Sequence, residues 1–208
     1  MKKQSALLIV SAVILTVSGC SSLQQPVRKI DYYTLEYQPT SAGSPSPLPV
    51  SIQIDRFQVS PAYDANRMIY SEEPFKRDAY VYHKWRANPG DLVTYFLARD
   101  LRKSSRFASV FSLKSRLTAS HILEGAVDEF YEHDGDDAWH AVLALDITLI
   151  KNKEPDISKR VIFQKQYRET QRCAQKHPRA LAEAMSKAMG IISGKITNDI
   201  AHHLADTP

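Results

Sequence analysis

The C-terminal segment from Pro178 to Leu204 constrains the fold most, because it is long and carries its apolar residues on one side only. These residues recur every three or four positions: Leu181, Met185, Ala188, Ile192, Ile196, Ile200 and Leu204. The spacing predicts one amphipathic helix with a continuous apolar stripe. A helix of this kind buries its stripe against another layer, so the rest of the chain must supply a matching apolar face.

A second, shorter helix is predicted from residue 88 to about residue 104. Asn88 is a favourable N-cap residue, and Pro89 suits the first turn of a helix. The apolar residues that follow again have helical spacing: Leu92, Val93, Phe96, Leu97 and Leu101. This helix also has one apolar stripe to bury.

The remaining segments have the composition of β-strands. They span residues 30–37, 50–57, 68–71, 79–85, 107–113, 121–130, 139–150 and 161–170. Alternation is clearest from Leu143 to Ile150, which predicts a sheet with one face in water. The acidic stretch 132–137 contains Asp134-Gly135, a hairpin signal. The predicted fold is therefore α+β: a single domain with a mostly antiparallel or mixed sheet and two amphipathic helices packed on it.

The N-terminus has the three-part order of a secretory signal. Lys2 and Lys3 supply positive charge, a short apolar run follows to Val17, and the small residues Ser18 and Gly19 precede Cys20. Small residues directly before a cysteine resemble the lipobox of bacterial lipoproteins, in which the cysteine receives a diacylglycerol and becomes the first residue. The alternative is an ordinary secretory signal that happens to contain a cysteine.

These features divide the chain into a signal peptide (1–19), a lipidated tether (20–29) that starts at Cys20, and a domain (30–208). Ser21 follows the cysteine, where aspartate would be the usual signal for retention in the inner membrane. We therefore expect acyl chains such as palmitate to anchor the protein in the outer membrane, facing the periplasm.

The charge of the mature chain gives no reason to expect binding of nucleic acid. Without Lys2 and Lys3, the 27 basic residues become 25 against 23 acidic ones, a net charge of about +2. With lipid on Cys20, Cys173 has no partner for a disulfide within the chain. We expect Cys173 to be structural or incidental.

None of the motifs of common enzymes or metal sites occurs. The acidic stretch 132–137 lacks the spacing of a calcium loop, and no histidine or cysteine pair has zinc spacing. The glycine-rich phosphate loops and the serine-nucleophile motifs are also absent. The sequence therefore predicts no enzyme activity, no metal and no cofactor.

Aromatic residues are concentrated between positions 63 and 85 and alternate with basic ones. This composition is typical of a binding surface, although half of the rings could equally pack in the core of a hairpin. The candidate partner-binding residues are Tyr63, Tyr70, Tyr80, Tyr82 and Trp85.

The same segment carries a resemblance to a known family. Tyr63-Asp64, Met68-Ile69-Tyr70 and the run 80–89, which ends in Trp85-Arg86-Ala87-Asn88-Pro89, resemble the signature of the ABC-type transport auxiliary lipoproteins of the PqiC/YmbA type. Tyr32-Tyr33-Thr34-Leu35 and Phe107-Ala108-Ser109-Val110 match further motifs of that family. The similarity covers about residues 30–204. Arg86 is a departure, because the family often has alanine directly after the tryptophan.

The resemblance implies a non-enzymatic component of an intermembrane lipid transport system. In such systems an MCE-domain protein of the PqiB type is anchored in the inner membrane, and the auxiliary lipoprotein docks its far end at the outer membrane. The resemblance also allows a homo-oligomer.

Two other functions stay open. One is a lipoprotein activator of a peptidoglycan synthase, although such activators usually have tethers much longer than residues 21–29, which span about 30 Å when extended. The other is a stand-alone periplasmic lipid-binding carrier, which would need a closed apolar cavity.

Overall fold

The computed structural model describes residues 28–39, 46–112 and 117–205. The predicted signal peptide, Cys20 and the tether up to residue 27 lie outside these ranges, so those predictions stay predictions. Along the chain the elements are β1 (Asp31–Tyr33), β2 (Leu48–Ile54), β3 (Gln58–Val59), β4 (Arg67–Ser71), β5 (Asp78–Trp85), α2 (Pro89–Lys103), β6 (Phe107–Ser112), β7 (His121–Asp134), β8 (Trp139–Lys151), the 3₁₀ turn η1 (Ile157–Lys159), β9 (Val161–Arg172) and α3 (Pro178–Ala205).

Strand β7 is the central strand of a nine-stranded mixed sheet. One of its edges pairs with β8 in antiparallel fashion along most of its length, and β9 continues beyond β8. Its other edge pairs in turn with three short parallel strands: β2, then β3, then β4. β6 lies beyond β2, and β5 and β1 lie beyond β4. The predicted α+β class, with a mixed sheet and two helices, is confirmed.

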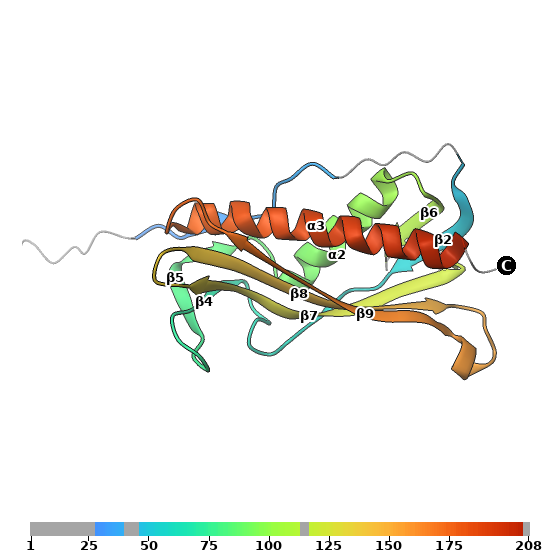
Figure 1. The fold of residues 1–208 in the computed structure, drawn as a ribbon, viewed down its shortest axis with the longest axis horizontal. Helices are drawn as coiled ribbons and strands as arrows, with labels where there is room; N and C mark the ends of the chain where they lie inside the picture. Colours follow the sequence, from blue (N-terminus) through green and yellow to red (C-terminus); the bar gives the residue numbers. More distant parts are fainter. Residues whose placement is uncertain (1–27, 40–45, 113–116, 206–208) are drawn as a thin grey trace, which may run out of the picture.

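Both helices cover the same face of the sheet (Figure 1). α3 lies along β8 and β9, and α2 packs beside it over β6 and β7. The facing side chains of β8 form the centre of the core, and each is fully buried: Leu143, Leu145, Ile147 and Leu149. The stripe of α3 closes the core from above, from Leu181 to Leu204. No helix among the described residues is long and apolar enough to span a membrane.

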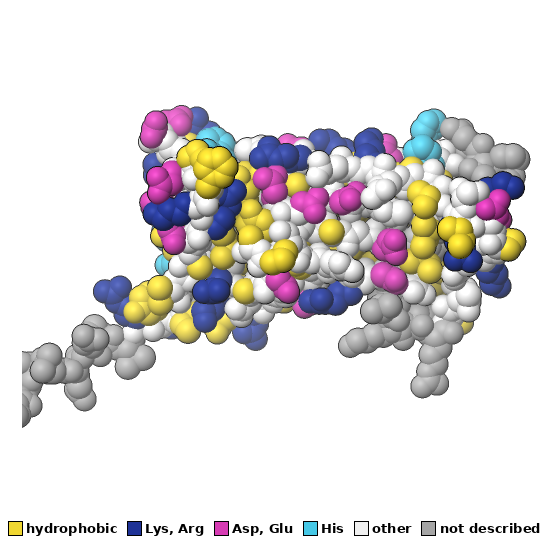
Figure 2. Space-filling view, turned by 90° about the horizontal axis from the view of Figure 1, so that it is seen from below, with side chains coloured by type: hydrophobic (Ala, Val, Ile, Leu, Met, Phe, Trp, Pro, Cys, Tyr) yellow, Lys and Arg dark blue, Asp and Glu magenta, His cyan; other side chains and the backbone are white. Residues whose placement is uncertain are grey.

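The opposite face of the sheet is open and mostly polar. Figure 2 views the molecule from that side and shows charged side chains of both signs over it, with hydrophobic side chains more frequent towards one end. Across this face Arg168 on β9 donates to Glu129 on β7 at 2.6 Å. Both residues are in register with Ala144 on the strand between them, so the ion pair passes over Ala144 and leaves it 2% exposed. This explains why the expected wet face of β8 is partly buried.

Three predicted strands differ from the structure. Of the segment 30–37 only Asp31–Tyr33 is a strand, and beyond it the N–H of Glu36 donates to the side chain of Ser186 on α3 instead of to a neighbouring strand. The segment 50–57 is interrupted after Ile54, because the N–H of Phe57 donates to the side chain of Thr94 on α2 instead of to a neighbouring strand. β7 extends through Asp134, whereas residues 132–134 were expected to belong to the turn. The turn itself is confirmed nearby, where the N–H of Gly135 donates to the carbonyl of Ala138.

Candidate functional site

The tyrosine-rich segment forms the β4–β5 hairpin at one end of the sheet (Figure 1). The structure brings the candidate partner-binding residues into this region but gives them different exposure. Tyr63 and Trp85 are buried, 5% and 1% exposed, and Tyr70 and Tyr80 are partly buried. Tyr82 is the most exposed of the candidates, at 38%.

Trp85 is part of the core. Its ring packs edge-on against Phe130 of β7, with ring centroids 5.1 Å apart. Its backbone N–H donates to the carbonyl of Asn66, and Tyr33 of β1 is its register partner. The side chain therefore holds β5 against the sheet and is not available at the surface.

Tyr63 connects the β3–β4 loop to the open face of the sheet. Its ring stacks on that of Tyr131, with centroids 5.8 Å apart and an interplanar angle of 12°. The Arg77 guanidinium lies 4.3 Å from the centroid of the Tyr131 ring and donates to the Tyr63 hydroxyl at 3.2 Å. These contacts fix the base of the β4–β5 turn.

Tyr80 points towards a buried carboxyl group. Its hydroxyl donates to Glu132 Oε1 at 3.0 Å, and Glu132 has no exposed surface. Burial raises the pKa of Glu132 to about 8, against the opposing effect of the hydrogen bond from Tyr80. At neutral pH this side chain is therefore mainly protonated.

Cys173 lies in the same region as a buried free thiol. Burial, together with the nearby Glu132, raises the pKa of the thiol to about 11. A thiol with so high a pKa is a poor nucleophile at neutral pH. This agrees with the structural use expected for Cys173.

Four exposed apolar side chains at this edge of the sheet belong to β1, the residue before it and the neighbouring strand β5, and we call them the edge patch: Ile30, Tyr32, Val81 and Tyr82. Arg28 lies 5.3 Å from the Tyr82 ring centroid, and Arg86 lies 5.5 Å from that of Tyr32. β1 is the last strand of the sheet on this side. An aromatic cluster with arginines over its rings, on a terminal strand, is suited to binding another protein.

Sequence reasoning missed Ile30, Tyr32 and Val81 as candidates. The segments of β1 and β5 were both expected as strands, but periodicity does not show which strand ends the sheet. Only the pairing order shows that β1, with β5 beside it, forms this edge of the sheet.

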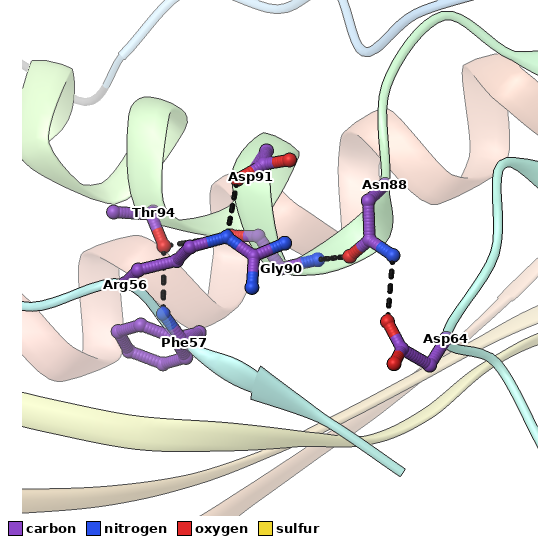
Figure 3. A network of polar contacts seen from close by, with 7 residues as sticks. All are labelled: Arg56, Phe57, Asp64, Asn88, Gly90, Asp91 and Thr94. Carbon is purple, nitrogen blue, oxygen red and sulfur yellow. Dashed lines mark hydrogen bonds and ion pairs between the residues drawn. The ribbon is translucent and has the colours of Figure 1, made fainter. Parts of the chain in front are cut away.

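A polar network explains the spacing of the motif that ends in Asn88-Pro89 (Figure 3). Asn88 caps α2 by accepting from the N–H of Gly90 at 2.9 Å, and its amide donates to Asp64 at 2.8 Å. The two halves of the motif, Tyr63-Asp64 and Asn88-Pro89, are therefore in direct contact.

The same network attaches the segment between β2 and β3 to the helix (Figure 3). Arg56 forms an ion pair with Asp91 at 2.6 Å, and the N–H of Phe57 donates to Thr94 at 2.9 Å. These contacts are structural, since they satisfy the first turn of α2 and the backbone at the strand break.

No group of three or more histidine, cysteine or acidic side chains in the described ranges is placed to hold a metal ion. A hollow of about 310 Å³ on the open face is lined mainly by polar and charged side chains: Asp55, Arg56, Gln58, Glu124, Asp146 and Thr148 among them. Such a lining does not suit an acyl chain.

Comparison with known proteins identifies the family. Residues 33–197 match the model of the ABC-type transport auxiliary lipoprotein component family, and the chain belongs to this family. The resemblance predicted from the sequence motifs is thereby confirmed. A search of curated proteins gave no match.

Solved structures show the same fold at low sequence identity. A protein of the DUF330 family from Xanthomonas campestris has a TM-score of 0.73 and 15% identity, covering 83% of this chain and 95% of its own. A hypothetical protein from Chlamydia trachomatis has a TM-score of 0.55 and 9% identity, covering 76% of this chain and 99% of its own. At these identities the likeness concerns the fold alone.

Proposed function

We propose that this protein is a non-catalytic periplasmic lipoprotein, anchored by lipid on Cys20 in the outer membrane, that docks an MCE-domain protein of the inner membrane. Family membership supports the auxiliary role, and the lipobox-like segment before Cys20 supports the anchor. The observation that carries the docking role is the edge patch, a set of exposed apolar and aromatic side chains on the terminal strand β1, the residue before it and the adjoining strand β5.

The position of the edge patch suits docking close to a membrane. The chain enters β1 directly from the tether, and Ile30 is itself part of the patch. Nine residues lie between Cys20 and Ile30, so the ten Cα–Cα steps span at most about 35 Å. Confinement near one leaflet raises the local concentration of the patch, so a modest intrinsic affinity suffices for docking.

The five candidate residues divide into two roles under this proposal. Tyr82 contacts the partner directly, together with Tyr32 and Val81. Tyr70 and Tyr80 support the hairpin from within, with ring centroids 4.8 Å apart, and Tyr63 and Trp85 fix it to the sheet.

Binding of the purified, lipidated protein in nanodiscs to an MCE-domain protein tests this assignment. The double variant Tyr32→Ser/Tyr82→Ser should weaken binding at least tenfold, since exposed tyrosines in interface centres commonly dominate affinity. Tyr95→Ser is the matched control, because Tyr95 is 63% exposed on α2, away from the patch. Wild-type affinity for the double variant, or an equal loss for the control, would contradict the role of the edge patch.

A further inference from the structure

The turn between β4 and β5, residues 72–77, presents a fully exposed aromatic ring. Phe75 is 106% exposed and has a φ of 66°. Left-handed backbone is uncommon for a bulky side chain and persists where surrounding contacts enforce it. We call residues 72–77 the hairpin tip.

Contacts on both sides of Phe75 hold the hairpin tip in this conformation. The Ser71 hydroxyl donates to the carbonyl of Glu73 at 2.9 Å and accepts from Arg77 at 2.9 Å. Lys76 lies between two carboxylates, 3.4 Å from Glu73 and 3.5 Å from Asp78. The backbone of the tip is therefore restrained, and it holds the Phe75 ring out in water.

Strand direction relates the hairpin tip to the tether. β1 runs parallel to β5, with Asp31 opposite His83, so the residues before Asp31 lie beside the residues before His83. Arg28 accordingly lies over Tyr82. The chain thus enters β1 from the side at which β5 begins, which is also the side of the hairpin tip.

Length and charge at this end permit contact with a bilayer. Seven residues lie between Cys20 and Arg28, so the eight Cα–Cα steps reach at most about 30 Å. Within residues 28–31 and 72–78 the basic and acidic residues are equal in number: Arg28, Lys29, Lys76 and Arg77 against Asp31, Glu72, Glu73 and Asp78. These two segments are therefore close to neutral, so their own charge neither opposes nor drives an apolar contact with lipid.

We propose that Phe75 inserts into the boundary between headgroups and acyl chains of the same leaflet that holds the lipid on Cys20. This inference rests on the proposed anchor. Aromatic rings favour this depth of a bilayer. One ring on a narrow, neutral tip suits a lipid surface better than a protein interface, which needs a broader contact area. The ring gives the domain a second point of attachment and so fixes its orientation on the membrane.

Fluorescence quenching by brominated phospholipids tests the insertion. The lipidated full chain is reconstituted into vesicles as the variant Phe75→Trp, and the wild type supplies the background of Trp85 and Trp139. Ile157→Trp is the matched control, because Ile157 is 78% exposed on η1, near the opposite end of β7. We expect bromines near the top of the acyl chain to quench the added fluorescence of Phe75→Trp at least twofold, and that of Ile157→Trp hardly at all.

Flotation of the same vesicles separates failure of the insertion from failure of the anchor. Protein that floats with the vesicles but shows no quenching at position 75 overturns the insertion and leaves the anchor intact. Protein that does not float overturns both. A fluorescence signal at position 75 that changes only on adding an MCE-domain protein or on self-association assigns the tip to a protein partner and also overturns the insertion.

Discussion

Glu132 shows at the scale of one residue how an acidic side chain can serve the core. It lies in the acidic stretch that the sequence assigns to a solvent-exposed turn, yet it is fully buried and accepts from Tyr80. Its raised pKa means that the folded protein keeps a proton that the unfolded chain has lost above a pH of about 4.5. Unfolding free energy should therefore fall as the pH rises from about 5 to 8 and level off above 8.

Glu132→Gln should remove this pH dependence, because the amide keeps an acceptor for Tyr80 and does not titrate. Between pH 5.5 and 7.5 we expect the free energy of unfolding of the wild type to fall by about 2 kcal/mol relative to the variant. Urea denaturation at a series of pH values measures the difference. Glu124→Gln, at an exposed position of the same strand, is the control. An unchanged slope in the Glu132→Gln variant would show that another group titrates.

Burial is also where prediction of individual site residues reaches its limit. Composition identified the aromatic segment, but the same alternation of tyrosine and basic residues fits rings on either face of a strand. The bulge in β5 between its pairings with β4 decides the faces, and it has no clear sequence signal. For this reason the sequence predicts Trp85 as a partner-binding residue, although its ring contacts Phe130 in the core.

At the scale of elements, the helices could be predicted from local sequence signals, whereas the ends of the strands could not. α2 begins at Pro89 after its Asn88 cap, and α3 spans residues 178–205, because spacing and capping are properties of the segment itself. The break after Ile54 depends on Thr94, a residue 37 positions from Phe57 in the chain. Contacts between residues so far apart in the chain produce no periodic pattern in the sequence from which a strand end could be predicted.

The start of α2 gives a test of how tightly these elements pack. A Cβ at Gly90 would lie 2.5 Å from the Phe57 carbonyl oxygen and 2.8 Å from Val59 Cγ2. Gly90→Ala should therefore lower the free energy of unfolding by about 2–3 kcal/mol, as overpacking against backbone does.

Asp91→Ala in the same helical turn is the control for Gly90→Ala. It removes only a half-exposed ion pair with Arg56 and should cost less than about 1 kcal/mol. Thermal or urea unfolding compares the two variants. Equal small losses would mean that the β2–β3 segment moves away from the helix more easily than the described packing implies.

At the scale of the whole molecule, the proposed anchor on Cys20 is the feature that would place the domain at a membrane. Mass spectrometry of the mature wild-type protein should find an N-terminal peptide that begins at Cys20 and carries the diacylglyceryl group. Cys20→Ser should abolish the modification and remove the protein from the outer-membrane fraction. Cys173→Ser is the matched control, since that buried thiol takes no part in anchoring. An unmodified mature N-terminus at another residue would contradict the proposed anchor.

Photo-crosslinking in intact cells tests the docking of an MCE-domain protein most directly. A photoreactive amino acid replaces Tyr82 in the edge patch and, as the control, Tyr95 on α2. The proposed function predicts an MCE-domain protein as the main adduct at position 82 and not at position 95. A peptidoglycan synthase as the main adduct, or phospholipid alone, would contradict it and would favour an activator or a lipid carrier, respectively.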